Sequence, residues 1–97
     1  MNVTEAQSTG VAFAVDQAWQ LNAQVALRDE SFGALAYHYG NRRLVFLKSR
    51  LLVELVSSLQ DYPSAAEAID AVVPDGQRDS YRRALARLAA SEVIDAC

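Results

Sequence analysis

The chain has a single cysteine, Cys97, and it is the last of the 97 residues. One cysteine leaves no disulfide framework, no zinc-binding cysteine cluster and no CxxC redox pair. The longest unbroken apolar run covers residues 11–15, whereas a membrane-spanning helix needs about 20 apolar residues. No basic residue precedes Arg28, so the start of the chain lacks the charged region of a secretory signal. We therefore expect a cytoplasmic protein without a membrane segment.

The composition is that of one globular domain, with 52% apolar and 22% charged residues. The net charge of −3 argues against general nucleic-acid binding. All the basic residues except Arg28 fall within residues 42–50 and 78–87, and the first of these windows has no acidic residue. Such windows suit an anionic partner, although two solvated surfaces are the simpler interpretation. We expect a flexible tail over residues 1–10 and a single domain over residues 11–97.

The first half of the domain carries strand patterns. Asp16 is placed to cap a short turn that contains Trp19. Residues 25–28 are expected to form a first strand, and residues 34–39 and 42–47 a β-hairpin around Gly40-Asn41, a pair that suits a type II′ turn. The numbers of two residues that lie opposite each other in this hairpin then add up to 81. Because side chains alternate along a strand, the hairpin has two faces. We expect the face with the larger side chains to pack on helices, and the Trp19 segment to cover part of the other face. The larger face pairs Tyr39 with Arg42, Tyr37 with Leu44 and Leu35 with Phe46, and the smaller pairs Ala36 with Val45 and His38 with Arg43.

The second half carries helical patterns. Ser49 is placed to cap a helix with an apolar stripe, and Ser64 and Glu67 form a capping box for a second, short helix. Asp75-Gly76 leads into a third helix with Tyr81, Leu85 and Leu88 on its buried face. The sequence thus predicts an α+β fold, with three strands followed by three helices.

Few residues offer chemistry. His38 lacks convergent partners for catalysis or metal binding, and Cys97 lacks a neighbouring base. The four glycines are too scattered for a phosphate-binding loop. Trp19 with the hairpin aromatics fits ordinary packing better than a ligand box. We expect no enzyme activity, no metal and no cofactor. A small winged-helix DNA-binding regulator remains an alternative, weakened by the acidic charge and by a third helix without Asn, Lys or Thr.

Residues 16–49 resemble a specific family. The segments DQAWQL and QVALRDESFGALAYHYGNRRLVFLKS are similar to the small peptide chaperones of mycofactocin biosynthesis. These chaperones belong to the peptide-recognition elements typified by the pyrroloquinoline-quinone chaperone. The elements that carry the resemblance are Trp19, residues 25–28 and 32–35, Tyr37, residues 42–44 and residues 46–48.

The resemblance implies a fold similar to a winged helix-turn-helix and a non-catalytic role. Such a protein would bind a short ribosomally made precursor peptide and present it to a radical S-adenosylmethionine maturase, which carries the iron–sulfur clusters. In related domains the leader adds as a strand along the third strand, over the third helix, and the family's precursors have acidic leaders. On a helical wheel, Arg78 and Arg82 flank the apolar seam of the third helix, and we expect Arg83 and Arg87 to point away from it into solvent. The expected peptide-binding residues are Arg42, Arg43, Leu44, Val45, Phe46 and Leu47 of the third strand, with Arg78, Arg82 and Leu85 of the third helix.

Overall fold

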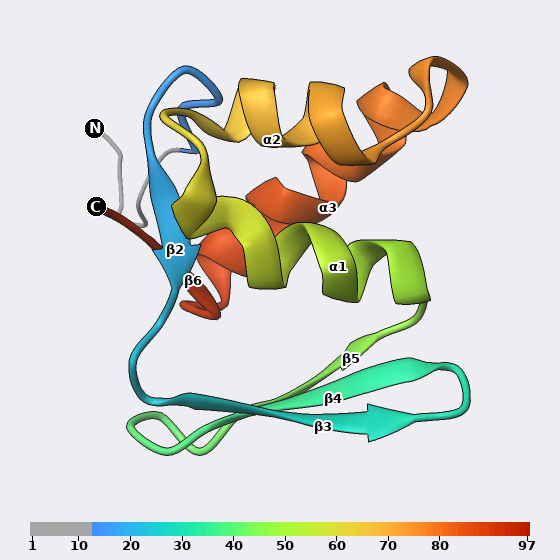
Figure 1. Cartoon of the computed structure of the whole chain (residues 1–97). Helices are drawn as coiled ribbons and strands as arrows, with labels where there is room; N and C mark the ends of the chain where they lie inside the picture. Colours follow the sequence, from blue (N-terminus) through green and yellow to red (C-terminus); the bar gives the residue numbers. More distant parts are fainter. Residues whose placement is uncertain (1–12) are drawn as a thin grey trace, which may run out of the picture.

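The computed structural model describes residues 13–97, and the expected tail over residues 1–10 lies outside them. The described residues form an α+β fold in which a three-stranded antiparallel sheet precedes three helices, which confirms the predicted class. The sheet forms one layer and the helices a second layer on one side of it (Figure 1). In chain order the elements are β2 (Trp19–Leu21), β3 (Val25–Glu30), β4 (Gly33–His38), β5 (Leu44–Leu47), α1 (Arg50–Ser58), the 3₁₀ turn η1 (Leu59–Asp61), α2 (Ala65–Val72), the 3₁₀ turn η2 (Asp75–Gln77), α3 (Arg78–Ala90) and β6 (Ile94–Ala96).

The hairpin of β4 and β5 has the predicted register. Leu35 lies opposite Phe46, and Tyr37 lies opposite Leu44. The expected packing of its two faces is wrong, however. Ala34 and Ala36 are buried against α1, whereas Tyr37, Leu44 and Phe46 are exposed. The two alanines allow α1 to approach the sheet closely, so the larger side chains lie on the outer face.

The hairpin loop also differs from the expected type II′ turn. The strands end at His38 and begin again at Leu44, and the residue with positive φ is Arg42 (63°) and not Gly40. The Arg42 N–H donates to the carbonyl of His38 at 2.7 Å. A Cβ at Gly40 would lie 2.8 Å from the buried His38 ring and 2.4 Å from the end of the Gln24 side chain, so one or both side chains would have to move. The loop is therefore five residues long, residues 39–43, and closes around His38.

His38 has the structural role that the sequence favoured. Its side chain is 4% exposed, and its Nδ1 accepts hydrogen bonds from the backbone N–H groups of Gly40 (3.0 Å) and Asn41 (3.1 Å). The imidazole thus accepts from two loop N–H groups that have no partner in a neighbouring strand. Its Nε2 has no hydrogen-bond partner among the described residues.

The segment that contains Trp19 is a strand and not the expected turn. β2 pairs antiparallel with β6 at the other end of the chain, with Trp19 opposite Ala96. The indole is 1% exposed and donates from Nε1 to the carbonyl of Ala14 at 2.8 Å. β2 packs on α1 and η1. The inner face of the hairpin is packed against α1, and not against the Trp19 segment as expected. A partner so distant along the chain leaves no local signal in the sequence of β2.

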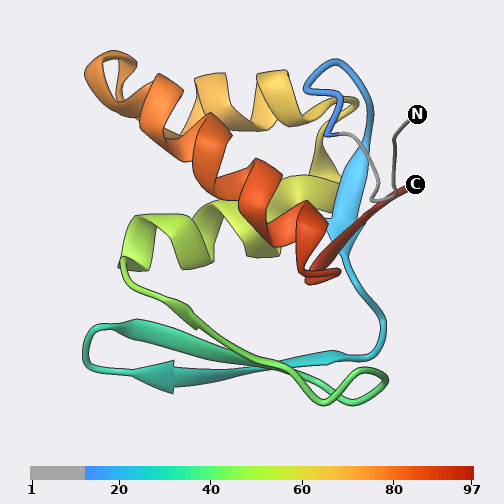
Figure 2. The same ribbon diagram turned by 180° about the vertical axis from the view of Figure 1, so that it is seen from behind.

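The end of α3 directs the chain back to β2. Val93 N–H donates to the carbonyl of Leu88 at 2.9 Å, and Glu92 N–H donates to that of Ala89 at 3.1 Å. These two bonds form a Schellman motif, in which the residue that follows the C-cap of the helix adopts a left-handed conformation. Here that residue is Glu92, with φ of 65°. β6 follows at once and lies beside β2 (Figure 2).

The predicted caps of the first two helices are present. The Ser49 side chain accepts from Leu52 N–H at 2.9 Å, and the Ser64 side chain accepts from Glu67 N–H at 3.2 Å. Between the helices the core is built from fully buried side chains, including Leu55, Leu59 and Leu85. Within residues 13–97, no helix is both long and apolar enough to cross a membrane.

Candidate functional site

The third strand of the sheet, β5, has a free edge. Among residues 13–97 the strand order is β3-β4-β5, so only one side of β5 is paired there. His38 N–H donates to the carbonyl of Arg43 at 2.9 Å, so Arg43 is bonded to β4. In an antiparallel pair only alternate residues of a strand bond to the same neighbour. Val45 and Leu47 therefore also bond to β4. The N–H and C=O groups of Leu44 and Phe46 therefore point to the free edge, where another strand can pair with them.

A groove of about 260 Å³ lies between the end of β5 and α3. Lys48, Ser49 and Leu52 line it on the sheet side, where the chain passes from β5 into α1. On the other side it is lined by residues at helical spacing along α3, namely Ser80, Tyr81, Ala84 and Arg87. The two walls are joined by a hydrogen bond of 2.8 Å between the Ser49 and Tyr81 hydroxyls.

The basic side chains around β5 have no ion-pair partners among residues 13–97. Of the nine Arg and Lys residues in the chain, Arg28, Arg78, Arg82 and Arg83 form ion pairs. The other five either flank β5 in the sequence or line the groove beside it, so uncompensated positive charge is concentrated at this edge. These five are Arg42, Arg43, Lys48, Arg50 and Arg87.

Two of the predicted α3 residues lie elsewhere. Arg78 donates to the carbonyls of Val73 (2.9 Å) and Asp70 (3.0 Å), and it pairs with Asp75 at 3.2 Å. Arg82 pairs with Asp79. Together Arg78 and Arg82 line a depression against α2, and not the groove beside β5. The interactions of Arg78 connect α3 to α2 and to the turn between these helices, whereas the partner of Arg82 lies on α3 itself.

Arg87 was expected to point into solvent, but it lines the groove beside β5. Five residues along a helix turn the side chain by about 140°, so Arg82 and Arg87 lie on opposite sides of the buried stripe of α3. Arg87 faces the groove, and Arg83 pairs with Asp79 outside it. Leu85 is 0% exposed and belongs to the core, so a peptide on the surface does not reach it. The sequence fits a helical wheel to α3 but does not indicate which flank faces β5.

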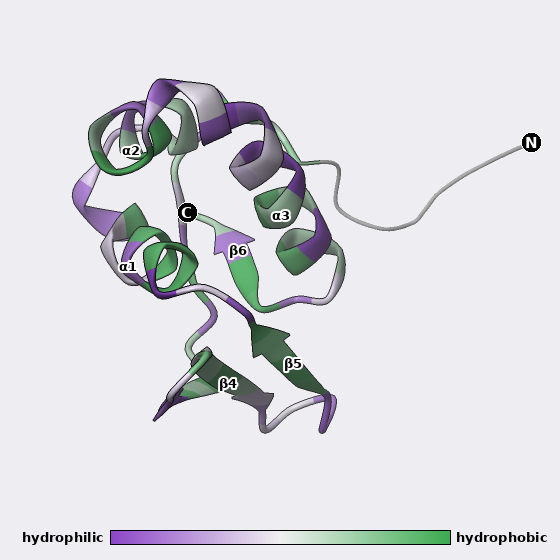
Figure 3. Cartoon of the chain, turned by 90° about the vertical axis from the view of Figure 1, so that its right-hand side faces the viewer, coloured by the Kyte–Doolittle hydropathy of each residue, from purple (hydrophilic) through white to green (hydrophobic). Residues whose placement is uncertain are grey.

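The outer face of the sheet is a feature that sequence reasoning missed. Its exposed side chains form two edge-to-face pairs, Phe32 with Phe46 (centroids 5.9 Å apart) and Tyr37 with Tyr39 (5.0 Å). Figure 3 shows β4 and β5 coloured as hydrophobic although the helices lie on only one side of them. The unbroken apolar stretches at residues 34–37 and 44–47 were the available signal, since a half-exposed antiparallel sheet normally alternates apolar and polar residues.

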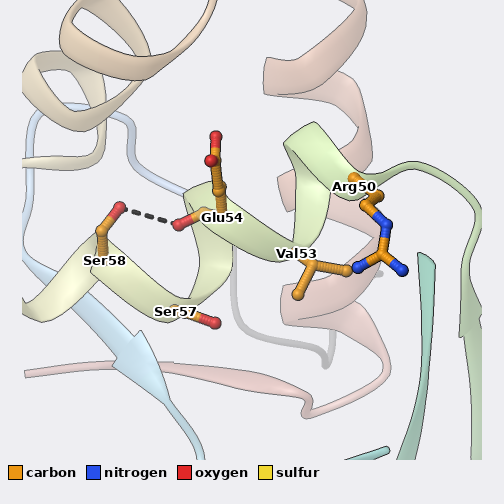
Figure 4. A pocket seen from close by; sticks show the side chains of 5 residues that line it. All are labelled: Arg50, Val53, Glu54, Ser57 and Ser58. Carbon is orange, nitrogen blue, oxygen red and sulfur yellow. Dashed lines mark hydrogen bonds between the residues drawn. The ribbon is translucent and has the colours of Figure 1, made fainter. Parts of the chain in front are cut away.

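The remaining features offer no catalytic arrangement. No cluster of three His, Cys, Asp or Glu side chains suited to a metal ion is found in the described part of the chain. A depression on the outside of α1 is lined by Arg50, Val53, Glu54, Ser57 and Ser58 (Figure 4). Its side chains point in different directions, and the Ser58 hydroxyl donates to the backbone carbonyl of Glu54 at 2.9 Å. This depression therefore has no convergent polar groups.

An open strand edge beside a groove, without catalytic groups, is the geometry of a domain that holds an extended peptide segment. The comparisons with known proteins identify the particular family. The model of the Peptide chaperone MftB family matches residues 18–95. The chain belongs to this family, and the resemblance found in the sequence is confirmed.

Three curated relatives carry the name Peptide chaperone MftB. The protein from Mycolicibacterium smegmatis is 47% identical over 87% of this chain and 83% of its own length. Those from Mycobacterium ulcerans and Mycobacterium tuberculosis are each 46% identical, over 86% and 84% of this chain and 77% and 76% of their own lengths. No solved structure matches the chain. A family of peptide chaperones confirms the expectation that this chain is not an enzyme, and it assigns the chain to mycofactocin biosynthesis.

Proposed function

We propose that this chain binds the mycofactocin precursor peptide as an added strand along β5 and delivers it, in the cytoplasm, to the radical S-adenosylmethionine maturase. The observation that carries the proposal is the free edge at Leu44 and Phe46, which continues into the groove beside α3. Main-chain hydrogen bonds to such an edge supply affinity, and the groove supplies selectivity for alternate side chains.

The charges around β5 favour an acidic leader. Residues 42–50 contain four basic and no acidic residues, and Arg87 adds a fifth positive charge from α3. The peptide-binding set that we propose keeps Arg42, Arg43, Leu44, Val45 and Phe46 and replaces Arg78 and Arg82 by Lys48, Tyr81 and Arg87. Leu47 and Leu85 are left out of it, because both are 0% exposed. No observation favours the DNA-binding alternative, because three of the four arginines of α3 are already paired with carboxylates.

A titration of labelled precursor peptide into charge-reversal variants tests this proposal. Arg87→Glu should weaken binding at least fivefold at low salt, and raising the salt concentration should weaken binding to the wild type, because exposed charges are screened. Arg83→Glu is the matched control on the same helix, and it should change affinity by less than about twofold. Equal effects of the two variants, or no binding by the wild type, would contradict the proposed site.

A further inference from the structure

The outer face of the three-stranded sheet carries more exposed apolar side chains than its fold requires. Phe32, Tyr37, Tyr39, Leu44 and Phe46 are exposed by 37–64%. Because large apolar side chains each carry about 200 Å² of surface, they form a patch of roughly 500 Å². A patch of this size is typical of an interaction site and not of an ordinary solvated face.

The precursor peptide does not cover this patch under the binding mode proposed above. Neighbouring strands lie about 4.8 Å apart, so a strand added to β5 lies about 10 Å from β4. Tyr37 projects outward from β4, and the ring of Tyr39, two residues further along the chain in the loop, packs against it. An added strand can contact Phe46 and Leu44 but leaves the two tyrosines exposed. The tyrosines therefore need a different occupant.

The charges at the border of the patch describe that occupant. Arg28 stands beside Leu35 on the outer face and is 80% exposed, and Lys48 lines a depression of about 320 Å³ together with Phe32 and Phe46. Arg28 is paired with Glu30, the carboxylate on this side of β3, at 3.1 Å, so these two charges balance each other. Lys48, which has no ion pair within residues 13–97, thus leaves one uncompensated positive charge beside the apolar depression. The depression and this charge fit a protein surface on which an apolar side chain lies next to a carboxylate.

A second copy of the chain fits this surface poorly. Two patches of roughly 500 Å² would bury about 1,000 Å² in total, which is below the size of most stable interfaces. Face-to-face packing would also place the unpaired Lys48 of each copy against an apolar face that offers it no unpaired carboxylate. An acidic partner supplies such a carboxylate, and the limited area suits an interface that forms and dissociates readily.

We propose that the outer face of the sheet is the docking surface for the maturase, a proposal that rests on the proposed function. A chaperone that presents a bound peptide must contact the enzyme through a surface that the peptide leaves free. The outer face meets that condition, since it adjoins β5 but extends over β4 and β3. Enzyme and peptide then bind on adjacent surfaces of the same sheet, one on its face and the other at its edge.

Binding of the purified maturase to variants of the full chain tests the docking surface. The double variant Tyr37→Thr/Tyr39→Thr keeps strand-forming residues and removes both rings, and Arg28→Glu reverses a border charge on the strand farthest from β5. Each should lower affinity for the enzyme, at least tenfold for the double variant and about fivefold for Arg28→Glu. Peptide affinity should stay within about threefold of the wild type in both. Ser57→Ala, at an exposed position of the depression along α1, is the control and should change neither affinity (Figure 4).

The outcomes separate this proposal from the function on which it rests. Unchanged enzyme affinity in both variants, or no enzyme binding by the wild type, overturns the docking surface. A micromolar wild-type dimer in sedimentation that the double variant abolishes, with enzyme affinity unchanged, assigns the face to self-association and overturns it as well. If enzyme binding depends on the two tyrosines and Arg28 but the wild type binds no precursor peptide, the docking surface stands and the proposed function fails.

Discussion

Replacement of Gly33 by alanine should displace the end of β5, which forms one wall of the groove. Gly33 opens β4 with a φ of 149°, a conformation that L-residues rarely adopt. A Cβ at this position would lie 2.1 Å from the carbonyl oxygen of Leu47 and 3.0 Å from the amide nitrogen of Ser49. The start of β4 thus passes directly beneath the point where β5 turns into α1, and only glycine leaves room for it.

The size of the effect follows from these two features. A residue held in a glycine-only conformation costs about 1–3 kcal/mol. Non-bonded contacts of carbon lie near 3.5 Å, so the Leu47 carbonyl must also move by more than about 1 Å, which weakens its ladder bond by about 1 kcal/mol. Gly33→Ala should therefore lower the free energy of unfolding by about 3 kcal/mol. For a domain of this size that corresponds to a fall in Tm of at least about 12 °C.

Thermal and urea unfolding followed by circular dichroism measure this loss. Gly76→Ala is the matched control, because a Cβ at that position would have no other atom within 4 Å and the φ of Gly76 is not positive. That variant should be unchanged or stabilised by up to about 1 kcal/mol. If Gly33→Ala unfolds within about 1 kcal/mol of the wild type, the close approach of β4 to the β5–α1 corner is not a constraint on the fold, and the reasoning is refuted.

Three further changes have defined expectations. Phe46→Pro should fold but bind precursor peptide at least tenfold more weakly than Phe46→Thr, since only proline removes the edge N–H; equal affinities of the two in a titration would argue against strand addition. Glu92→Gly should raise the free energy of unfolding by about 1 kcal/mol in urea denaturation, because glycine adopts the left-handed conformation without strain; a loss of stability would contradict this. His38→Ala should lower the free energy of unfolding by about 1–3 kcal/mol, because two loop N–H groups lose their acceptor, while peptide affinity stays within about threefold; an unchanged urea midpoint would refute this role.

Much of the fold could be predicted from the sequence because its signals are local. The caps at Ser49 and Ser64 depend on residues three positions away, and the hairpin register depends on strands joined by a short loop. The pairing of β2 with β6 could not be predicted in the same way. Trp19 and Ala96 become neighbours only after the helices between them in the chain have packed, and neither three-residue strand is long enough to show a pattern.

The candidate site could be predicted in outline but not in orientation. The free edge of β5 follows from the strand order, which three consecutive strands suggest. The hairpin, however, is apolar on both faces, so hydrophobicity alone does not indicate that Ala36 faces the helices and Tyr37 faces outward. The pattern of α3 likewise does not indicate which flank of the helix faces β5. Arg82 was expected beside β5 and Arg87 away from it, whereas Arg87 lines the groove and Arg82 does not. Both orientations were decided by tertiary packing, namely the close approach of α1 to two alanines and the contact of α3 with the β5–α1 corner, where the Tyr81 and Ser49 hydroxyls are joined by a hydrogen bond.

Amide hydrogen exchange at single-residue resolution tests the addition of a peptide strand to β5 most directly. In the free protein, the N–H groups of Val45 and Leu47 should exchange slowly, because they bond to β4, and those of Leu44 and Phe46 should exchange rapidly at the open edge. Saturation with precursor peptide should slow exchange at Leu44 and Phe46 at least tenfold and change Val45 and Leu47 much less. Rapid exchange at both edge residues in the saturated complex would contradict strand addition at β5.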